Sequence, residues 1–258
     1  MDYGGAMIRL YVAQPKLAAG LVFAPDPGQA HYLSAVMRLK AGDEIAVFNG
    51  LDGEWQARVS EAGKKRILLE AIQALRPQTA PRRITLAIAM VKRSALEYAV
   101  EKATELGVEA IDLVITQRSN AVHTKVERLD YIAIESAEQT ERLELPQIRT
   151  PVKFDAWLSA SQHDLVIFGD EDSTHEGDEK PTRSLLEVLQ GVKAEPSYAD
   201  ASIAVVIGPE GGFNDDERRA LRAHPRVKPV NLGPRILRAD TAAISALTLV
   251  QAVLGDWR

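Results

Sequence analysis

The sequence IGPEGGF at residues 207–213 is the most informative stretch of this 258-residue chain. It ends a β-branched apolar run, residues 203–207, which predicts a buried strand. Three glycines and a proline then predict a tight turn, because glycine takes positive φ without a steric cost. Asn214 is a suitable N-cap for a following helix, and Glu217 completes the pattern of a capping box. A glycine-rich loop is therefore expected at the carboxyl end of a strand, where α/β sheets usually bind ligands.

A second loop of the same kind follows in the sequence. Residues 227–232 predict another strand, GPRILR at residues 233–238 predicts a loop, and a helix is expected from about Asp240. Each loop alone is consistent with an ordinary strand-to-helix connection. Two such loops, close in sequence and each ending a buried strand, favour a ligand site.

The loop chemistry narrows the class of ligand. No Gly-Lys-Ser/Thr follows the glycines of the first loop, and their spacing is not that of a dinucleotide-binding motif. The carboxylate of Glu210 would repel a pyrophosphate, whereas it suits ribose hydroxyls or a positively charged group. A sulphonium cofactor therefore fits better than a dinucleotide, and an enzyme that uses ATP or NAD is the alternative.

Composition excludes several kinds of site. The chain has no cysteine, which excludes disulfides, thiolate zinc sites, iron–sulphur clusters and a cysteine nucleophile. The five histidines are scattered without an H-x-x-x-H pair, so we expect no metal. No apolar run approaches the roughly 20 residues of a membrane span. The leader, residues 1–6, is neither basic nor apolar and does not resemble a secretory signal, so we expect a cytoplasmic protein without a membrane partner.

The front of the chain differs from the rest in charge and pattern. The net charge is −5, but residues 1–83 carry +3 and the remainder carries −8. A modest basic surplus is consistent with RNA binding and equally with a solvated surface. Short strands with turn signals between them and one short helix predict a small β-barrel domain over residues 1–75. The strands are expected at residues 7–12, 21–24, 44–49, 54–60 and 66–71, and the helix at residues 28–38.

The remaining chain, residues 84–258, alternates strands with helices after a proline-containing linker at residues 76–83. Such alternation predicts a parallel sheet covered by helices on both faces. Further strands are expected at residues 84–91, 108–116 and 164–169, and helices at residues 94–107, 125–143, 182–190 and 241–254. Ser94 and Glu97 have the spacing of a capping box for the first of these helices.

The two loop motifs, GPEGGF at residues 208–213 and LGPRILR at residues 232–238, closely resemble those of the RsmE family. These are small-subunit (16S) ribosomal RNA uridine N3 methyltransferases of the SPOUT superfamily. The segments ELG at residues 105–107 and EQTER at residues 138–142 also resemble the family pattern. Thr140 and Asp240 are mild departures, since serine or cysteine and glutamate are expected there.

The resemblance implies an α/β fold: a SPOUT-type parallel sheet with a C-terminal trefoil knot, preceded by a PUA-like RNA-binding barrel. It also implies S-adenosyl-L-methionine as cofactor, ribosomal RNA of the small subunit as substrate and an obligate homodimer. By analogy with the superfamily, three loops enclose the adenine and ribose of the cofactor through backbone groups. The implied cofactor-binding residues are Phe168, Gly169, Ile207, Gly208, Pro209, Glu210, Gly211, Leu232, Gly233, Ile236 and Leu237.

The reaction itself assigns further roles. Uracil N3 carries a proton, so methylation needs a base or a cation that stabilises the anion. Arg238 is the candidate cation, and a helix-terminal ion pair with Asp240 is the alternative role. Glu210 is expected to orient the cofactor or to act as the base. Arg9, Arg38 and Arg118 are candidate RNA contacts.

The missing cysteine agrees with methylation at nitrogen, because methylation at pyrimidine C5 normally uses a thiolate to activate the ring. Two alternatives stay open within this fold. One is an RNA-binding protein without catalysis, and the other is a ribose 2′-O RNA methyltransferase.

Overall fold

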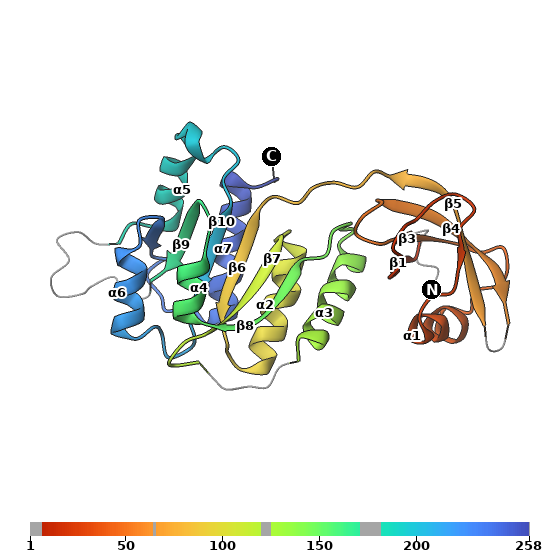
Figure 1. The fold of residues 1–258 in the computed structure, drawn as a ribbon, viewed down its shortest axis with the longest axis horizontal. Coiled ribbons are helices and arrows are strands. Elements are labelled where there is room, and N and C mark those ends of the chain that lie inside the picture. The colour runs from red at the N-terminus through yellow and green to blue at the C-terminus, as the bar shows by residue number, and fades with distance from the viewer. Residues whose placement is uncertain (1–6, 64–65, 120–124, 171–181, 258) are drawn as a thin grey trace. The chain divides into compact units, whose positions relative to one another are not determined.

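The computed structural model describes residues 7–63, 66–119, 125–170 and 182–257. The chain forms two compact units, one from Met1–Ala80 with Ala137–Leu145 and the other from Pro81–Ser136 with Pro146–Arg258 (Figure 1). Residues 77–83, between the last strand of the first unit and the first strand of the second, form neither helix nor strand. The leader at residues 1–6, and the prediction made for it, lie outside the described residues.

The first unit is built on a five-stranded sheet with the order β1-β3-β4-β5-β2. Strand β1 pairs with β3 in parallel, and the other neighbours are antiparallel. Alternate apolar side chains of the long strands, such as Val47, Val59 and Leu69, form its core. All five predicted strands are present, as Arg9–Tyr11 (β1), Val22–Phe23 (β2), Glu44–Phe48 (β3), Glu54–Ala62 (β4) and Ile67–Arg76 (β5).

The predicted helix at residues 28–38 is two short helical segments. Helix α1 (Pro27–His31) starts with a capping box from Asp26, and a π-helical turn (η1, Tyr32–Val36) follows it. Arg38 then takes a left-handed conformation with φ 56°, which ends the helical run.

The last residues of helix α3 (Val126–Gln139), from Ala137 onward, belong to the first unit, where a buried arginine binds them. The Arg9 guanidinium donates to Glu54 Oε1 at 2.6 Å and to the carbonyls of Ala137 and Glu138 at 2.9 and 3.0 Å. A cation there satisfies carbonyls that a helix terminus leaves open. The Arg9 side chain is only 9% exposed. Its prediction as an RNA contact is therefore replaced by a structural role.

Two arginines share the carboxylate of Glu54. Arg76 Nε donates to Glu54 Oε2 at 2.7 Å, while Arg9 occupies Oε1. Burial opposes ionisation of Glu54, but the hydrogen bonds from Arg76 and Arg9 hold the pKa of this carboxyl below its ordinary value. The Glu54 carboxylate therefore links β1, which carries Arg9, to the hairpin formed by β4 and β5.

The second unit contains a six-stranded sheet, and all of its strand pairs are parallel. The spatial order is β11-β9-β10-β6-β7-β8, so the two strands predicted before the glycine loops, β10 and β11, flank β9. The strands are Ile84–Ala89 (β6), Ala110–Ile115 (β7), Gln147–Lys153 (β8), Leu165–Gly169 (β9), Ile203–Ile207 (β10) and Val227–Val230 (β11).

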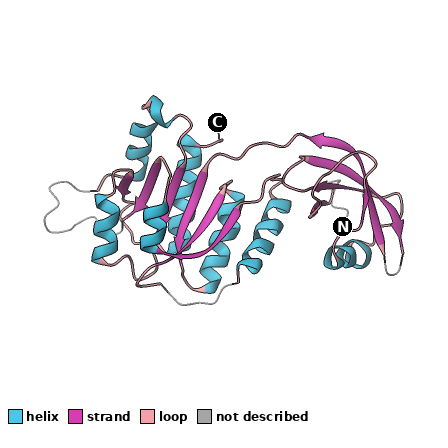
Figure 2. Cartoon of the chain, viewed as in Figure 1, coloured by secondary structure: helices cyan, strands magenta, loops and turns pink. Residues whose placement is uncertain are grey.

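Helices cover both faces of this sheet, which confirms the prediction (Figure 2). One face packs against α2 (Arg93–Glu105), α3, α5 (Leu185–Lys193) and α7 (Ala239–Leu254). The other packs against α4 (Phe154–Ala160) and α6 (Asp215–Ala223). A 3-10 turn at Pro196–Tyr198 (η2) precedes β10. None of the described helices has the length and apolar content that crossing a bilayer requires.

Several details differ from the sequence prediction, which did not include helix α4. Helix α2 has Lys92 as its N-cap residue, and the Lys92 side chain makes no capping bond. Glu97 pairs with Arg93 at 2.7 Å, so the predicted Ser94–Glu97 capping box is wrong. Helix α3 ends at Gln139, before Glu141 takes a left-handed conformation. Strand β8 was missed because its mostly exposed, polar sequence lies at the edge of the sheet.

Candidate functional site

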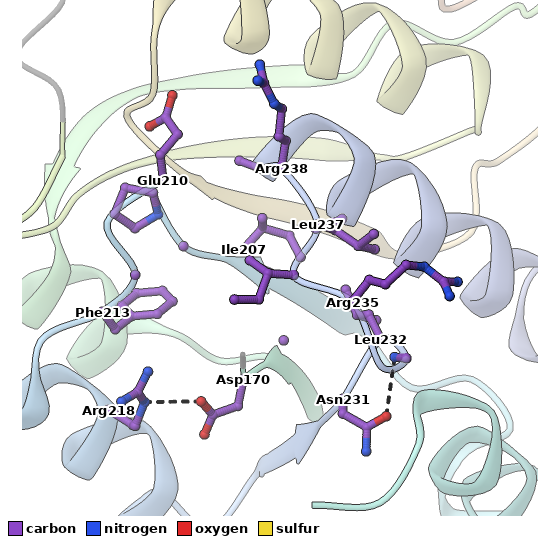
Figure 3. Close-up of a pocket in the computed structure, with 18 of the residues that line it drawn as sticks. Asp170, Ile207, Glu210, Phe213, Arg218, Asn231, Leu232, Arg235, Leu237 and Arg238 are labelled. Atoms are coloured by element: carbon purple, nitrogen blue, oxygen red, sulfur yellow. Dashed lines mark hydrogen bonds and ion pairs between the residues drawn. The ribbon is translucent and has the colours of Figure 1, made fainter. Parts of the chain in front are cut away.

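A cavity of about 290 Å³ lies beyond the carboxyl ends of β9, β10 and β11. It brings together the two predicted loops, which are separated in the sequence by helix α6 (Figure 3). The predicted residues that line it are Gly169, Ile207, Gly208, Pro209, Glu210, Leu232, Gly233, Ile236, Leu237 and Arg238. Lining residues that were not predicted are Asp170, Gly212, Phe213, Arg218, Asn231, Pro234, Arg235, Ala239 and Ala242.

The first loop, residues 208–213, is tightly folded around glycine. The Gly212 N–H donates to the Pro209 carbonyl at 2.9 Å, and Gly212 has φ 67°, so a tight turn forms where it was predicted. A Cβ added at Gly208 would lie 2.8 Å from a ring carbon of Phe213. Glycine at position 208 is therefore needed for close approach of the ring.

Phe213 anchors this loop in an aromatic cluster behind the cavity. Its ring packs edge-on against Phe168 at 5.3 Å and is tilted against Phe154 at 5.8 Å. Phe168 is fully buried and does not line the cavity, although it was predicted to bind the cofactor. Gly211 does not line the cavity either, because it faces the side chain of Arg118.

The helix that follows the first loop begins as predicted. Asn214 Oδ1 accepts from the Glu217 N–H at 2.8 Å, and Glu217 Oε2 accepts from the Asn214 N–H at 3.0 Å. This reciprocal capping box starts α6 directly after Phe213. The second oxygen of Glu217 accepts from the backbone N–H of Gln117 at 2.8 Å, a bond that no local pattern indicates.

The second loop, residues 233–238, is hydrogen-bonded at its start, and further along it a large side chain is exposed to solvent. Asn231 Oδ1 accepts from the Gly233 N–H at 3.3 Å, and the Asn231 backbone bonds to both Arg183 and Leu185. Gly233 has φ 110°, a backbone conformation that favours glycine, although a Cβ added there would meet no atom within 4 Å. Past this point the side chain of Ile236 is 83% exposed.

Arg238 is the N-cap residue of α7, and its side chain makes no capping bond. The guanidinium is exposed, and the part of the chain that the structure describes places no carboxylate within ion-pair distance of it. The alternative pairing with Asp240 is not formed, since Asp240 Oδ1 accepts from the Thr241 N–H at 2.6 Å. Figure 3 shows Arg238 and Glu210 at the same end of the cavity.

A buried charge cluster forms the opposite end of the cavity (Figure 3). The Asp170 carboxylate is inaccessible to solvent and lies 3.1 Å from Arg218 Nε and 2.7 Å from Arg222 Nη2. Both arginines come from α6, so the cluster fixes that helix to the end of β9. Sequence reasoning missed it because its members are about 50 residues apart and share no motif. Within the described ranges, no three His, Asp or Glu side chains gather as a metal site would require.

Comparison with known proteins identifies the family. Residues 78–251 match the family model of the RNA methyltransferase domain, and residues 25–72 match that of the RNA methyltransferase PUA domain. The chain belongs to this family of RNA methyltransferases. A protein named ribosomal RNA small subunit methyltransferase E from Rickettsia conorii is 34% identical over 94% of each chain. One of the same name from Synechocystis is also 34% identical, over 95% of this chain and 78% of the relative. The family predicted from the two loop motifs is confirmed.

Solved structures of similar methyltransferases agree with the fold. A putative methyltransferase from Legionella pneumophila, solved with bound SAM (S-adenosylmethionine), is 30% identical with a TM-score of 0.79 and covers 98% of this chain and 100% of its own. A ribosomal RNA small subunit methyltransferase E from Neisseria gonorrhoeae is 24% identical with the same TM-score and likewise covers 98% of this chain and 100% of its own. The latter likeness shows the fold, which is a parallel α/β sheet with a PUA domain.

Proposed function

We propose that this protein is an S-adenosylmethionine-dependent methyltransferase that methylates N3 of a uridine in 16S ribosomal RNA. The observation that carries the proposal is the single cavity formed by the two glycine loops, in a chain that belongs to an RNA methyltransferase family. The names of its relatives and the SAM bound to the Legionella protein support the substrate and the cofactor.

The residues present fit this cofactor. A cavity of about 290 Å³ lies at the lower end of the range for small-molecule sites, about 300–1,000 Å³. Ile207, Leu232 and Leu237 offer apolar contacts to an adenine, and the glycine loops leave room for backbone hydrogen bonds. Glu210 at one end suits a ribose hydroxyl, an ammonium group or the positive sulphonium.

When bound, S-adenosylmethionine supplies an electrophilic methyl group for an in-line displacement. The protein must then align the uridine and compensate the charge that develops when N3 loses its proton. Arg238 is suited to this role, because its guanidinium is exposed at the cavity and no described carboxylate neutralises it. We assign Glu210, at the same end, to orienting the cofactor and hold it as the candidate acceptor of the N3 proton.

We assign RNA binding to the PUA-like domain, residues 1–75, and to the rim of the cavity. Arg38 is exposed within the stretch that matches the PUA model. Arg9 is excluded because its guanidinium is buried. A phosphate contact from Arg38 would position the RNA, while the cavity selects the base.

We further propose a C-terminal trefoil knot and a cytoplasmic homodimer. The strand order supports the knot, because β11 lies outside β9 while α7 returns to pack against β6 and β10. The homodimer is proposed by analogy with the family that the two loop motifs resemble. Light scattering of the purified protein should give twice the chain mass, and a monomer would contradict this part.

Calorimetry and methyl transfer test the function together. The protein should bind S-adenosylmethionine, and ATP or NAD should not compete with it. Small ribosomal subunits from a strain that lacks the enzyme should accept a labelled methyl group, and mass mapping should place it on uridine N3. No binding would favour a non-catalytic RNA-binding protein, and a label on a ribose 2′-oxygen would favour the other class of RNA methyltransferase.

A further inference from the structure

A short turn after β7 lies directly against the first cavity loop. This turn, residues 116–119, is folded by Ser119, whose Oγ accepts from the Thr116 N–H at 2.9 Å and lies 2.9 Å from the Thr116 hydroxyl. It comes about 90 residues before the first loop in the sequence, and β7 is separated from β10 by β6. The sheet therefore brings the turn and the loop to the same edge.

Arg118 of this turn binds the outer side of the loop. Its Nη1 donates to the Gly211 carbonyl at 2.9 Å and to the Phe213 carbonyl at 3.4 Å. Its aliphatic stem packs on Gly211, because a Cβ added there would meet Cβ and Cδ of Arg118 at 3.5 and 3.6 Å. One side chain therefore binds two carbonyls of the loop.

A second set of bonds joins the same turn to the end of the loop. The Gln117 N–H donates to Glu217, which is 8% exposed and also accepts from the Asn214 N–H. The side-chain oxygen of Gln117 accepts from Asn214 Nδ2. The turn is thus bonded to the loop at Gly211 and Phe213 and to the capping box that follows.

We infer that Arg118 is a positioning residue for the methyl donor: it holds the first loop in its cofactor-binding conformation and so raises the affinity of the cavity. The inference rests on the proposed function. A glycine-rich chain has many backbone conformations, and ordering it on binding would cost affinity. Fixing two of its carbonyls beforehand removes part of that cost. Gly208 and Pro209 line the cavity, and Arg118 holds the loop from its other side.

This role predicts a different result from the RNA contact expected for Arg118 from the sequence. An RNA contact would change the affinity for ribosomal subunits and leave cofactor binding intact. A positioning residue would change cofactor affinity and leave RNA affinity intact. The two affinities can be measured separately on the same protein.

The test compares Arg118→Ala and Arg118→Lys with the unchanged protein. Calorimetry should show that Arg118→Ala weakens S-adenosylmethionine binding about tenfold, the effect of losing a hydrogen bond from a charged group. Arg118→Lys should recover part of this loss, because an ammonium can still reach one carbonyl but lacks the guanidinium fork. The KM for the cofactor should rise more than kcat falls, and filter binding to small ribosomal subunits should not change.

Arg219→Ala is the matched control. Arg219 lies on α6 soon after the same loop, but its side chain is 74% exposed and, among the described residues, pairs with exposed Asp216 at 3.0 Å. It should leave both affinities unchanged. Unchanged cofactor affinity in Arg118→Ala with weaker subunit binding would overturn the inference, and so would equal losses in Arg118→Ala and Arg219→Ala. Absence of cofactor binding by the unchanged protein would instead refute the proposed function from which the inference starts.

Discussion

The two loops of the cavity are built in opposite ways. The first, residues 208–213, is held by the Phe213 aromatic cluster, by the Asn214–Glu217 capping box and by Arg118. The second, residues 233–238, is hydrogen-bonded at Asn231 and packs Leu237 against the core, but Ile236 and Arg238 are exposed. A loop fixed in advance favours binding of a small ligand, whereas exposed groups are available to a second molecule. On the proposed function, the first loop provides cofactor affinity and the second provides contacts to the RNA or to the partner subunit.

The strongest test of the first loop is Gly208→Ala. Its new Cβ would lie 2.8 Å from the Phe213 ring, which Phe168 and Phe154 prevent from moving freely. We expect calorimetry to show S-adenosylmethionine binding weakened by about 100-fold or more, which corresponds to about 2.7 kcal/mol. Gly211→Ala is the control, because its Cβ would meet Arg118 at an ordinary 3.5 Å. Similar losses in both variants would contradict the close-packing account.

Arg238→Ala tests whether the second loop serves the reaction. Because this side chain makes no capping bond and pairs with no described carboxylate, its loss should not change stability or cofactor affinity. Single-turnover methyl transfer should slow by about 100-fold, the effect of removing one group that stabilises developing charge. Arg238→Lys should retain part of the rate. A loss of cofactor affinity equal to the loss in rate would assign Arg238 to binding instead.

Asn214→Ala tests the capping box that ends the first loop. Removing an N-cap costs about 1 kcal/mol, so we expect a similar fall in the free energy of unfolding in urea. Cofactor affinity should also fall a few-fold, since the cap is bonded to the loop and to Gln117. Ser184→Ala removes an equivalent capping box from α5 and should cost the same stability without that loss of affinity. Equal cofactor affinity in Asn214→Ala and Ser184→Ala would show that the Asn214 cap has no part in cofactor binding.

The smallest effect is expected at His163, which lies just before β9 at the amino-terminal ends of the parallel strands. His163 contacts the Ser161 and Thr85 hydroxyls at 3.0 and 3.1 Å, and burial lowers the pKa of this imidazole. The unfolded chain, with an ordinary His pKa of about 6.5, binds the proton first. The free energy of unfolding should therefore fall as pH drops through about 6.5 toward the lower folded-state pKa. Urea titrations of His163→Gln should lack this part of the slope, and an identical slope would rule out His163 as its source.

Local chemistry explains what sequence reasoning predicted correctly at the site. The turn at Pro209–Gly212 and the Asn214–Glu217 cap join residues three apart, so residue types and spacing alone predict them. Apolar periodicity also predicted the parallel sheet and its covering helices. The motifs of the two loops were enough to indicate the family. The same reasoning failed at Ser94, because a capping spacing does not decide where a helix begins.

Residue types and their spacing were enough to predict most of the elements, the two loops and the family of this protein, but not strand β8 or helix α4. Only the tertiary structure decided that Arg9 closes the end of α3 some 130 residues away, that Arg218 and Arg222 surround Asp170, and that Arg118 holds the first loop. The physical reason is distance along the chain. A turn or cap depends on neighbouring residues, whereas these contacts exist only after the fold brings distant segments together.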